Sequence, residues 1–341
     1  DYFNHTAATI RGIPGQLTST YSRLKPAART RNDKWLEVNL ENHTWVNETL
    51  ERKKLIAQRD SLSSILKIAS DDTYITSVIH PEAENQVLDN ILHTLDFDHV
   101  YNRERLETFI KASKSDRWQR DWVKDEYIFE FAQKILNEEL DRPKLVVVYT
   151  IGTHAFGEPS STKANYTTER NITRRIESID YDLCNFLNNL NGRDFFQNNI
   201  VVITTDHALW PEPEYIELKK SLGEDNPKFV ARVPLIIRAP NLHAGRRSVL
   251  GRNSLDLVPT ILDLIETKNV PVSFIGKSLF ELDPIDSYYV SAIGDDFYIT
   301  NGGGLVKIQT LSERRVKDKL EKWVRWVYEL ENQNRIAPRR M

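Results

Sequence analysis

Short apolar runs alternate with longer amphipathic stretches through the middle of the chain. Four runs are rich in Val, Ile and Leu, which predicts β-strands at 73–79, 145–151, 199–205 and 233–238. The amphipathic stretches have apolar residues at helical spacing, which predicts helices at 62–69, 85–95, 122–140 and 168–190. This alternation is typical of an α/β fold in which a mostly parallel central sheet lies between helices.

The N-terminal part of the chain has a weaker pattern. Residues 1–30 are rich in Thr, Ser, Gly and Pro, which predicts a loop that leads into a short helix, with the hydroxyls exposed at the turn. Residues 33–60 are charged and weakly periodic, and we interpret them as a helical or irregular insertion. Residues 95–101 are predicted to form a short strand or turn.

The C-terminal part contains a further helix and a small group of elements after it. Residues 253–265 begin with cap-type side chains, and Pro259 falls near the helix start, where proline is tolerated. Beyond them the pattern predicts short strands at 288–293 and 304–309 and a Trp-rich helix from 312 to about 331. Since the chain shows no repeat and no linker, we expect a domain of residues 1–285 with a small α+β appendage, residues 286–341, packed on it.

The run at 199–205 is apolar and β-branched throughout, which indicates a strand buried on both faces. It ends at Asp206 and His207, and open α/β sheets bind ligands at the carboxyl ends of their strands. A carboxylate and an imidazole together suit a divalent metal ion. The alternative is that Asp206 caps a helix and His207 packs locally.

Two other predicted strands also end in histidine. Thr153 and His154 follow the strand at 145–151, and His80 follows the strand at 73–79. A single histidine at a strand end is more often structural than functional. Three strand ends that meet at one edge of a sheet favour a polar site there.

Composition excludes several classes of function. The net charge of −3 offers no basic surface for nucleic acid. The single cysteine, Cys184, excludes an internal disulfide framework and a cysteine-based zinc site. Gly302–Gly304 lacks the Lys-Ser/Thr of a P-loop, so a hairpin turn is its better interpretation, and no Gly-x-Ser-x-Gly elbow occurs. The sequence has no apolar run of about 20 residues that would span a membrane.

The order of motifs resembles a known family. TIGTH at 150–154, VVITTDH at 201–207, VPLIIRAP at 233–240 and SLDLVPTILDL at 254–264 resemble the sulfatase-like branch of the alkaline phosphatase superfamily. LSSILK at 62–67, LDFD at 95–98 and WVKDEYIFEFA at 122–132 are similar to the group of lipoteichoic acid synthases and periplasmic phosphoglycerol or phosphoethanolamine transferases. Each motif is short, but the ordered set covers nearly the whole chain.

The resemblance implies a threonine nucleophile. In these transferases a Thr in a loop near the domain start attacks phosphorus, and TAATIRG at 6–12 is similar to that loop, with Thr9 first and Thr6 second in preference. The alternative is a surface loop. Sulfatases proper need a Cys/Ser-x-Pro-x-Arg motif to make formylglycine. Cys184 does not match it, because Phe186 and Asn188 stand at the proline and arginine positions.

The resemblance also assigns the other site residues. Asp206 and His207 would bind one divalent metal ion (Mn, Zn or Mg) together with Thr9. His154 would lie near the transferred group, where it would stabilise phosphate charge or protonate the leaving oxygen. His80 roughly matches a substrate-contacting histidine of the lipoteichoic acid synthases. Arg11 would contact the phosphate, unless it is simply a surface charge of the loop.

The sequence departs from the family pattern at two points. The family has a further acidic metal ligand at the end of a first strand, which would fall before Asp1, and without it the metal would keep three protein ligands. The Trp-Asn-Arg patch that contacts glycerophosphate in lipoteichoic acid synthases would fall near Asn85–Leu88, where neither Trp nor Arg occurs. Phosphoglycerol specificity therefore does not follow from the resemblance.

The resemblance leads to an expected function. We expect a metal-dependent phosphotransferase that moves a phosphoglycerol- or phosphoethanolamine-like group from a phospholipid-type donor to an envelope glycan or lipid. The alternatives are a phosphodiesterase or sulfatase-like hydrolase, and a degenerate domain that binds glycans or headgroups without turnover. The expected location is the extracytoplasmic face of the cell envelope, with membrane attachment through an upstream segment, and the expected state is a monomer.

Overall fold

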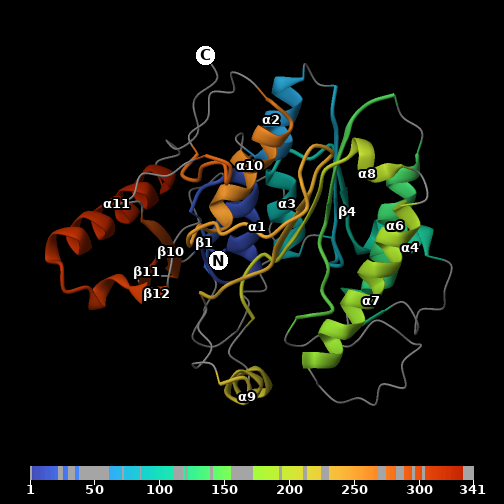
Figure 1. Ribbon diagram of the computed structural model, residues 1–341. Coiled ribbons are helices and arrows are strands. Elements are labelled where there is room, and N and C mark those ends of the chain that lie inside the picture. Colours follow the sequence, from blue (N-terminus) through green and yellow to red (C-terminus); the bar gives the residue numbers. More distant parts are fainter. Residues whose placement is uncertain are drawn as a thin grey trace.

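The computed structural model describes most of the chain (Figure 1). The described residues are 2–21, 26–29, 35–37, 61–70, 73–84, 86–110, 118–119, 122–138, 141–154, 172–191, 194–209, 213–223, 230–267, 274–281, 288–293, 296–301 and 304–332. Most of the insertion at 33–60 lies outside them, apart from strand β2 (Trp35–Glu37), which pairs antiparallel with β1 (Pro26–Arg29). Figure 1 shows a central layer of strands with helices on both sides.

The parallel sheet is built around β3 (Ile75–Ile79). Strands β4 (His99–Tyr101) and β7 (Lys144–Val148) lie on either side of β3, and both run parallel to it. Parallel strands need crossover connections on the faces of the sheet, and the amphipathic helices of this chain provide them. The α/β fold predicted from the alternating pattern is therefore confirmed.

A second pair of strands carries the Asp-His motif. β8 (Val201–Thr204) pairs antiparallel with β9 (Leu235–Arg238), from Val201 opposite Arg238 to Thr204 opposite Leu235. The prediction that β8 is buried on both faces is wrong, because all four of its residues are half-buried, like those of β7. Within the described residues, β7 pairs only with β3 and β8 only with β9, so one edge of each lacks a neighbouring strand.

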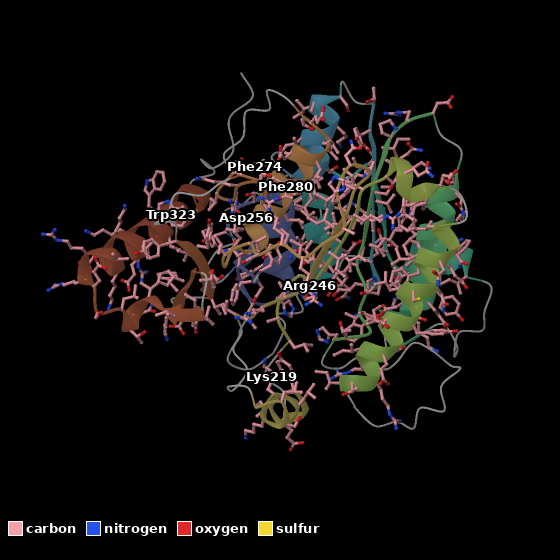
Figure 2. The ribbon with its side chains drawn as sticks, viewed as in Figure 1. Lys219, Arg246, Asp256, Phe274, Phe280 and Trp323 are labelled. Carbon is pink, nitrogen blue, oxygen red and sulfur yellow. The ribbon has the colours of Figure 1, made fainter. Side chains whose placement is uncertain are left out.

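Helices cover the two faces of the parallel sheet. One face is packed by α1 (Thr9–Thr18), α2 (Leu62–Ala69), α3 (Val87–Thr94) and α10 (Leu257–Leu264), whose apolar residues share one core with Val78. Phe274 lies against the same core, beside α10 in Figure 2. The opposite face is packed by α4 (Arg103–Phe109), α6 (Asp125–Asn137) and α7 (Ile172–Asn191), followed by α8 (Phe195–Asn198). Helix α9 (Pro213–Ser221) follows β8.

Two local predictions are wrong. The helix predicted for 122–140 begins only at Asp125, because Lys124 has an extended backbone and Trp122–Val123 form β6, which pairs with β5 (Trp118–Gln119). The hydroxyls expected at the surface near the start of the chain are buried, with Thr9 8% and Thr6 2% exposed. Their burial also contradicts the surface-loop alternative for this segment.

The C-terminal elements form a small antiparallel sheet under a long helix. Strands β10 (Tyr289–Ile293), β11 (Asp296–Asn301) and β12 (Gly304–Lys307) follow in order, and α11 (Arg314–Asn332) comes after a short 3-10 turn, η3 (Ile308–Thr310). The pattern of the sequence did not predict β11. The pairing of Asn301 with Gly304 confirms the hairpin interpretation of the glycine-rich segment.

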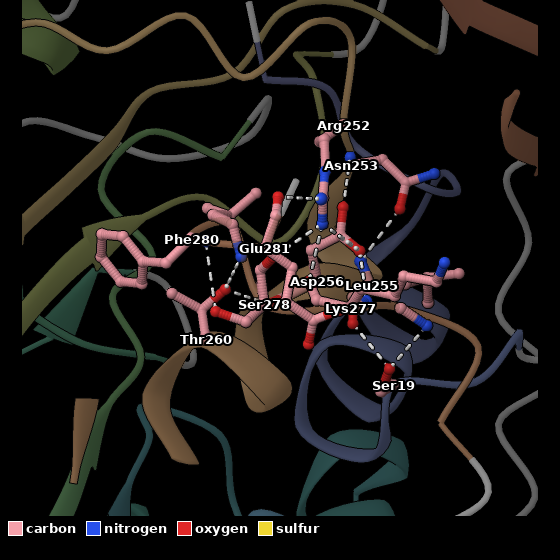
Figure 3. Close-up of polar contacts among 12 residues, drawn as sticks. Ser19, Arg252, Asn253, Leu255, Asp256, Thr260, Lys277, Ser278, Phe280 and Glu281 are labelled. Atoms are coloured by element: carbon pink, nitrogen blue, oxygen red, sulfur yellow. Dashed lines mark hydrogen bonds and ion pairs between the residues drawn. The ribbon is translucent and has the colours of Figure 1, made fainter. Parts of the chain in front are cut away.

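A buried arginine links the segment just before α10 to the chain at 277–281 (Figure 3). Arg252 donates hydrogen bonds to the carbonyl oxygens of Lys277, Ser278 and Glu281, at 2.9–3.0 Å. Asn253 caps the 3-10 turn η2 (Ser254–Asp256), which leads directly into α10. Because a buried guanidinium is costly unless its N–H groups are paired, this cluster specifies the path of the chain at 274–281.

Candidate active site

Thr9 lies at the first position of α1, where a strained backbone introduces the helix. The preceding residue, Ala8, has a backbone φ of 68°, an angle that residues with a Cβ rarely adopt. Strain of this kind persists only where the surrounding structure enforces it. Here the turn places the Thr9 hydroxyl 3.3 Å from Nε2 of His207 and 3.1 Å from the hydroxyl of Tyr149.

Helix α1 contacts the segment after β8 without a side chain between them. A Cβ on Gly12 would lie 2.4 Å from the carbonyl oxygen of Asp206, so only glycine allows this approach. One turn later, Gln16 donates a hydrogen bond to the carbonyl oxygen of Thr205 at 2.5 Å. These two contacts explain how residues almost 200 positions apart, Thr9 and His207, come to lie within hydrogen-bond distance.

Replacement of Gly12 tests this close approach. Gly12→Ala should push α1 away from Asp206, lower the free energy of unfolding by about 1–3 kcal/mol and reduce any activity that depends on Thr9 by about a hundredfold. Chemical denaturation and steady-state kinetics measure both effects. Gly245→Ala is the matched control, because a Cβ there would meet nothing within 4 Å. Equal behaviour of the two variants would contradict the close packing.

The ring of His207 has a defined orientation. Nδ1 lies 2.6 Å from the carbonyl oxygen of Ala208, and since that oxygen can only accept, Nδ1 carries the proton. In the neutral ring, Nε2 then presents its lone pair toward the hydroxyl of Thr9 and toward Oδ2 of Asp206, which is 3.5 Å away. The other carboxylate oxygen, Oδ1, accepts the backbone N–H of His207 at 3.0 Å.

These three side chains suit a metal ion. Ligands held tetrahedrally at about 2.1 Å from zinc lie about 3.4 Å from one another, close to the 3.3 Å and 3.5 Å found around Nε2 of His207. Oδ2 of Asp206 is buried and receives no hydrogen bond from the described residues, as expected of an oxygen that would bind a cation. Within those residues, no group of three or more His, Cys, Asp or Glu side chains has metal-site geometry.

Tyr149 is a site residue that the sequence analysis missed. It follows β7, and its hydroxyl lies 3.1 Å from that of Thr9. Burial, and next the negative charge of Asp206, raise the pKa of Tyr149 well above its usual value. The phenol therefore stays protonated at neutral pH and can donate a hydrogen bond to the oxygen of Thr9. Within an apolar predicted strand, Tyr149 had no sequence signal that separated it from a core residue.

The segment that carries His154 is held by two buried side chains. Asp125, the first residue of α6, accepts the backbone N–H groups of Ile151 and Gly152, each at 2.8 Å. Arg175 of α7 donates to the carbonyl oxygen of His154 at 2.6 Å. The ring of His154 itself is half-buried, with its centroid 5.5 Å from that of Trp122. His154 is thus presented on a rigid turn.

The contribution of Asp125 to the free energy of unfolding should depend on pH. Burial raises the pKa of Asp125 to about 7, partly offset by its two backbone hydrogen bonds. Since the unfolded carboxyl has a pKa of about 4, Asp125 stabilises the fold fully below about pH 4, and this contribution is lost as the pH rises through about 7. The unfolding free energy of the wild type minus that of Asp125→Asn should be more positive at pH 5 than at pH 8. A difference that does not change with pH would contradict the assignment.

The other predicted residues, His80, Arg11 and Thr6, are all buried. His80 is fully buried, and its Nε2 lies 3.2 Å from Oδ1 of Asp89, which also accepts a hydrogen bond from Asn102. Arg11 lies in α1 and is only 1% exposed, so the alternative that it is a surface charge is wrong. Thr6, the second candidate nucleophile, donates its hydroxyl to the carbonyl oxygen of Ala292 at 2.9 Å.

Comparison with known proteins decides the family. The sequence profile of the family described as Sulfatase matches residues 1–267. The chain belongs to the sulfatase family. Its membership supports an enzymatic role, as expected from the motifs, over the non-catalytic alternative.

Several solved structures share the fold of this chain. An alkaline phosphatase superfamily protein from Vibrio parahaemolyticus is 14% identical, with a TM-score of 0.71 over 99% of this chain and 79% of that one. The lipoteichoic acid synthase LtaP from Listeria monocytogenes is 14% identical, with a TM-score of 0.64 over 98% and 82%. A phosphonate monoester hydrolase from Silicibacter pomeroyi is 12% identical, with a TM-score of 0.50 over 97% and 87%. At these identities the likeness shows the fold alone.

Proposed function

We propose that this sulfatase-family protein is a phosphotransferase that works through a covalent intermediate on Thr9. The observation that carries the proposal is the position of the Thr9 hydroxyl, which is almost fully buried between Nε2 of His207 and the hydroxyl of Tyr149. Thr9 cannot be converted to formylglycine, which is made from Cys or Ser, so the hydroxyl itself would be the nucleophile. Phosphorus esters suit such a nucleophile.

Two displacements at phosphorus would complete the reaction. In the first, Thr9 loses its proton to solvent, its Oγ1 forms a bond to phosphorus, and the bond to the leaving alcohol breaks. His154, on its anchored turn, would give a proton to that leaving oxygen. In the second, the hydroxyl of an acceptor gives its proton to His154 and attacks the same phosphorus, and Thr9 is released, with its proton restored from solvent.

A divalent ion (Mn, Zn or Mg) bound by Asp206, His207 and Thr9 would supply positive charge that lowers the pKa of the hydroxyl and opposes the charge on phosphate. Tyr149 would donate a hydrogen bond to the oxygen of Thr9 and fix its rotamer. It would remain neutral throughout, because its raised pKa resists ionisation. His80 and Arg11, both buried, remain proposed substrate contacts.

We further propose the class of substrate and the location. A phospholipid-type donor would supply a phosphoglycerol- or phosphoethanolamine-like group, and an envelope glycan or lipid would accept it, on the extracytoplasmic face of the cell envelope. The fold shared with a lipoteichoic acid synthase supports this choice. No helix in the described part of the chain is long and apolar enough to cross a bilayer.

A phosphodiesterase is the second candidate. It would use the same intermediate, with water in place of the acceptor hydroxyl. The shared fold of a phosphonate monoester hydrolase favours keeping this alternative. The two functions differ in the second displacement alone, so they are separated by the acceptor and not by the site.

Chromogenic substrates test the proposal. The metal-loaded protein should hydrolyse bis(p-nitrophenyl) phosphate at least about tenfold faster than p-nitrophenyl sulfate, because Thr9 would favour phosphorus. Added glycerol should divert the phosphoryl group from water to a glycerol ester if the protein is a transferase. A preference for the sulfate ester would contradict the proposed chemistry, whereas the absence of a glycerol ester would favour the phosphodiesterase.

A further inference from the structure

Helix α11 has two faces of different character. Val324 and Val327 are buried against Phe297 and Ile299 of the C-terminal sheet. On the other face, four exposed side chains follow one another at helical spacing of four, three and four residues: Arg315, Lys319, Lys322 and Trp326. Residues at this spacing lie along one line on a helix. We call these four residues, together with Trp323, the outer face of α11.

Two tryptophans lie on this face in contact with solvent. Trp326 is 58% exposed and Trp323 is 36% exposed. Trp323 makes an edge contact with the ring of Tyr21, at 5.9 Å between centroids, so it is partly fixed by the body of the protein. Large exposed aromatic side chains that adjoin one another usually mark an interaction site.

The charge of this end of the chain differs from that of the rest. Residues 314–341 contain nine Lys and Arg against four Asp and Glu, which is a net charge of +5. Residues 1–313 contain the other 37 Lys and Arg and 45 Asp and Glu, which is a net charge of −8. On α11 itself, Asp318 is partly neutralised by Arg314, with 3.9 Å between their charged atoms. A partner of this face is therefore expected to be anionic.

We propose that the outer face of α11 binds the surface of an anionic phospholipid membrane. Tryptophan prefers the interface between headgroups and acyl chains, and Lys and Arg beside it are attracted to anionic headgroups. An anionic glycan, whose sugar rings would stack on the indoles, is the alternative partner that the vesicle experiment separates from a membrane.

The position of α11 allows this contact. Figure 1 shows α11 at the edge of the molecule, outside the C-terminal sheet and on the opposite side from α7. Figure 2 shows Trp323 on that edge. The helix could therefore lie along a membrane surface while its apolar face stays packed on the sheet. This contact does not depend on the chemistry proposed for Thr9.

Vesicle binding tests the proposal on the full chain. Sedimentation should show binding to phosphatidylglycerol-containing vesicles and much weaker binding to pure phosphatidylcholine. Each basic residue near an anionic surface contributes about fivefold to affinity, so Lys319→Glu/Lys322→Glu should weaken binding by at least about tenfold. Trp326→Ala should weaken it several-fold and reduce the blue shift of tryptophan fluorescence on binding, with the remainder coming from Trp323.

The matched control is Lys219→Glu/Lys220→Glu on α9, which changes charge equally at another surface helix. It should bind vesicles like the wild type, and all variants should keep the wild-type melting temperature and hydrolyse a water-soluble phosphodiester normally. Equal binding to both vesicle types would overturn the proposal. So would charge reversal on α11 that acts no more strongly than on α9, or an unchanged Trp326→Ala, which would indicate a general polyanion site.

Discussion

Thr9→Ala should lower the rate of phosphodiester hydrolysis by at least about a thousandfold, because it removes the attacking oxygen and leaves the rest of the site in place. The side chain contacts Tyr149 and His207 through its hydroxyl, so the loss should appear in kcat. The melting temperature should change little, whereas metal affinity should fall, because Thr9 would be one of the three ligands. Stopped-time assays with bis(p-nitrophenyl) phosphate and metal analysis of the same sample measure all three quantities.

Thr6→Ala is the matched control for this prediction. Thr6 lies in the same segment and is also buried, but its hydroxyl donates to the backbone of β10. The variant should lose about 1 kcal/mol of stability and keep most of the activity. If Thr6→Ala were inactive and Thr9→Ala active in equally folded proteins, Thr6 and not Thr9 would be the nucleophile.

Asp206→Ala should abolish both metal binding and activity. It removes the charged ligand, and the buried Oδ2 that receives no hydrogen bond from the described residues would no longer be available to a cation. We expect metal affinity to fall by at least about a hundredfold, beyond the loss typical of an outer-shell partner. Titration with a metal indicator measures the affinity directly.

Asp141→Ala provides the comparison for Asp206→Ala. Asp141 is an exposed aspartate outside the site, so its loss should leave metal affinity and kcat unchanged. If Asp206→Ala bound metal as tightly as this variant did, Asp206 would not be a metal ligand. Its hydrogen bond to the backbone of His207 would then be its main role.

The order of helices and strands could be predicted from the sequence because each element has a strong local period. The strand ends could be predicted for the same reason, and with them the place of Asp206 and His207 just after β8. β11 was missed because only its three central residues, Phe297–Ile299, are apolar or aromatic, and this run is too short to predict a strand. The antiparallel direction of β9 and the half-burial of β8 depend on neighbours far away in the chain.

Other parts of the site could not be predicted, because they arise only in three dimensions. Tyr149 reads as a core residue until the fold brings Thr9 to it. Asp125 reads as an ordinary N-terminal helix acid, although it binds the backbone of the turn that carries His154. The requirement for glycine at Gly12 depends on the carbonyl of Asp206, which is remote in sequence. Long-range packing contacts leave no local signal.

The central claim is that Thr9 carries the phospho-group, and trapping tests it most directly. The metal-loaded protein is mixed with excess phosphodiester, quenched in acid within the first turnover and digested, and the peptide that contains Thr9 is analysed by mass spectrometry. We predict a phospho-substituent on Thr9 that is absent from the Thr9→Ala and Asp206→Ala proteins. A trapped group on another residue, or burst-phase turnover with Thr9 unmodified, would contradict the account.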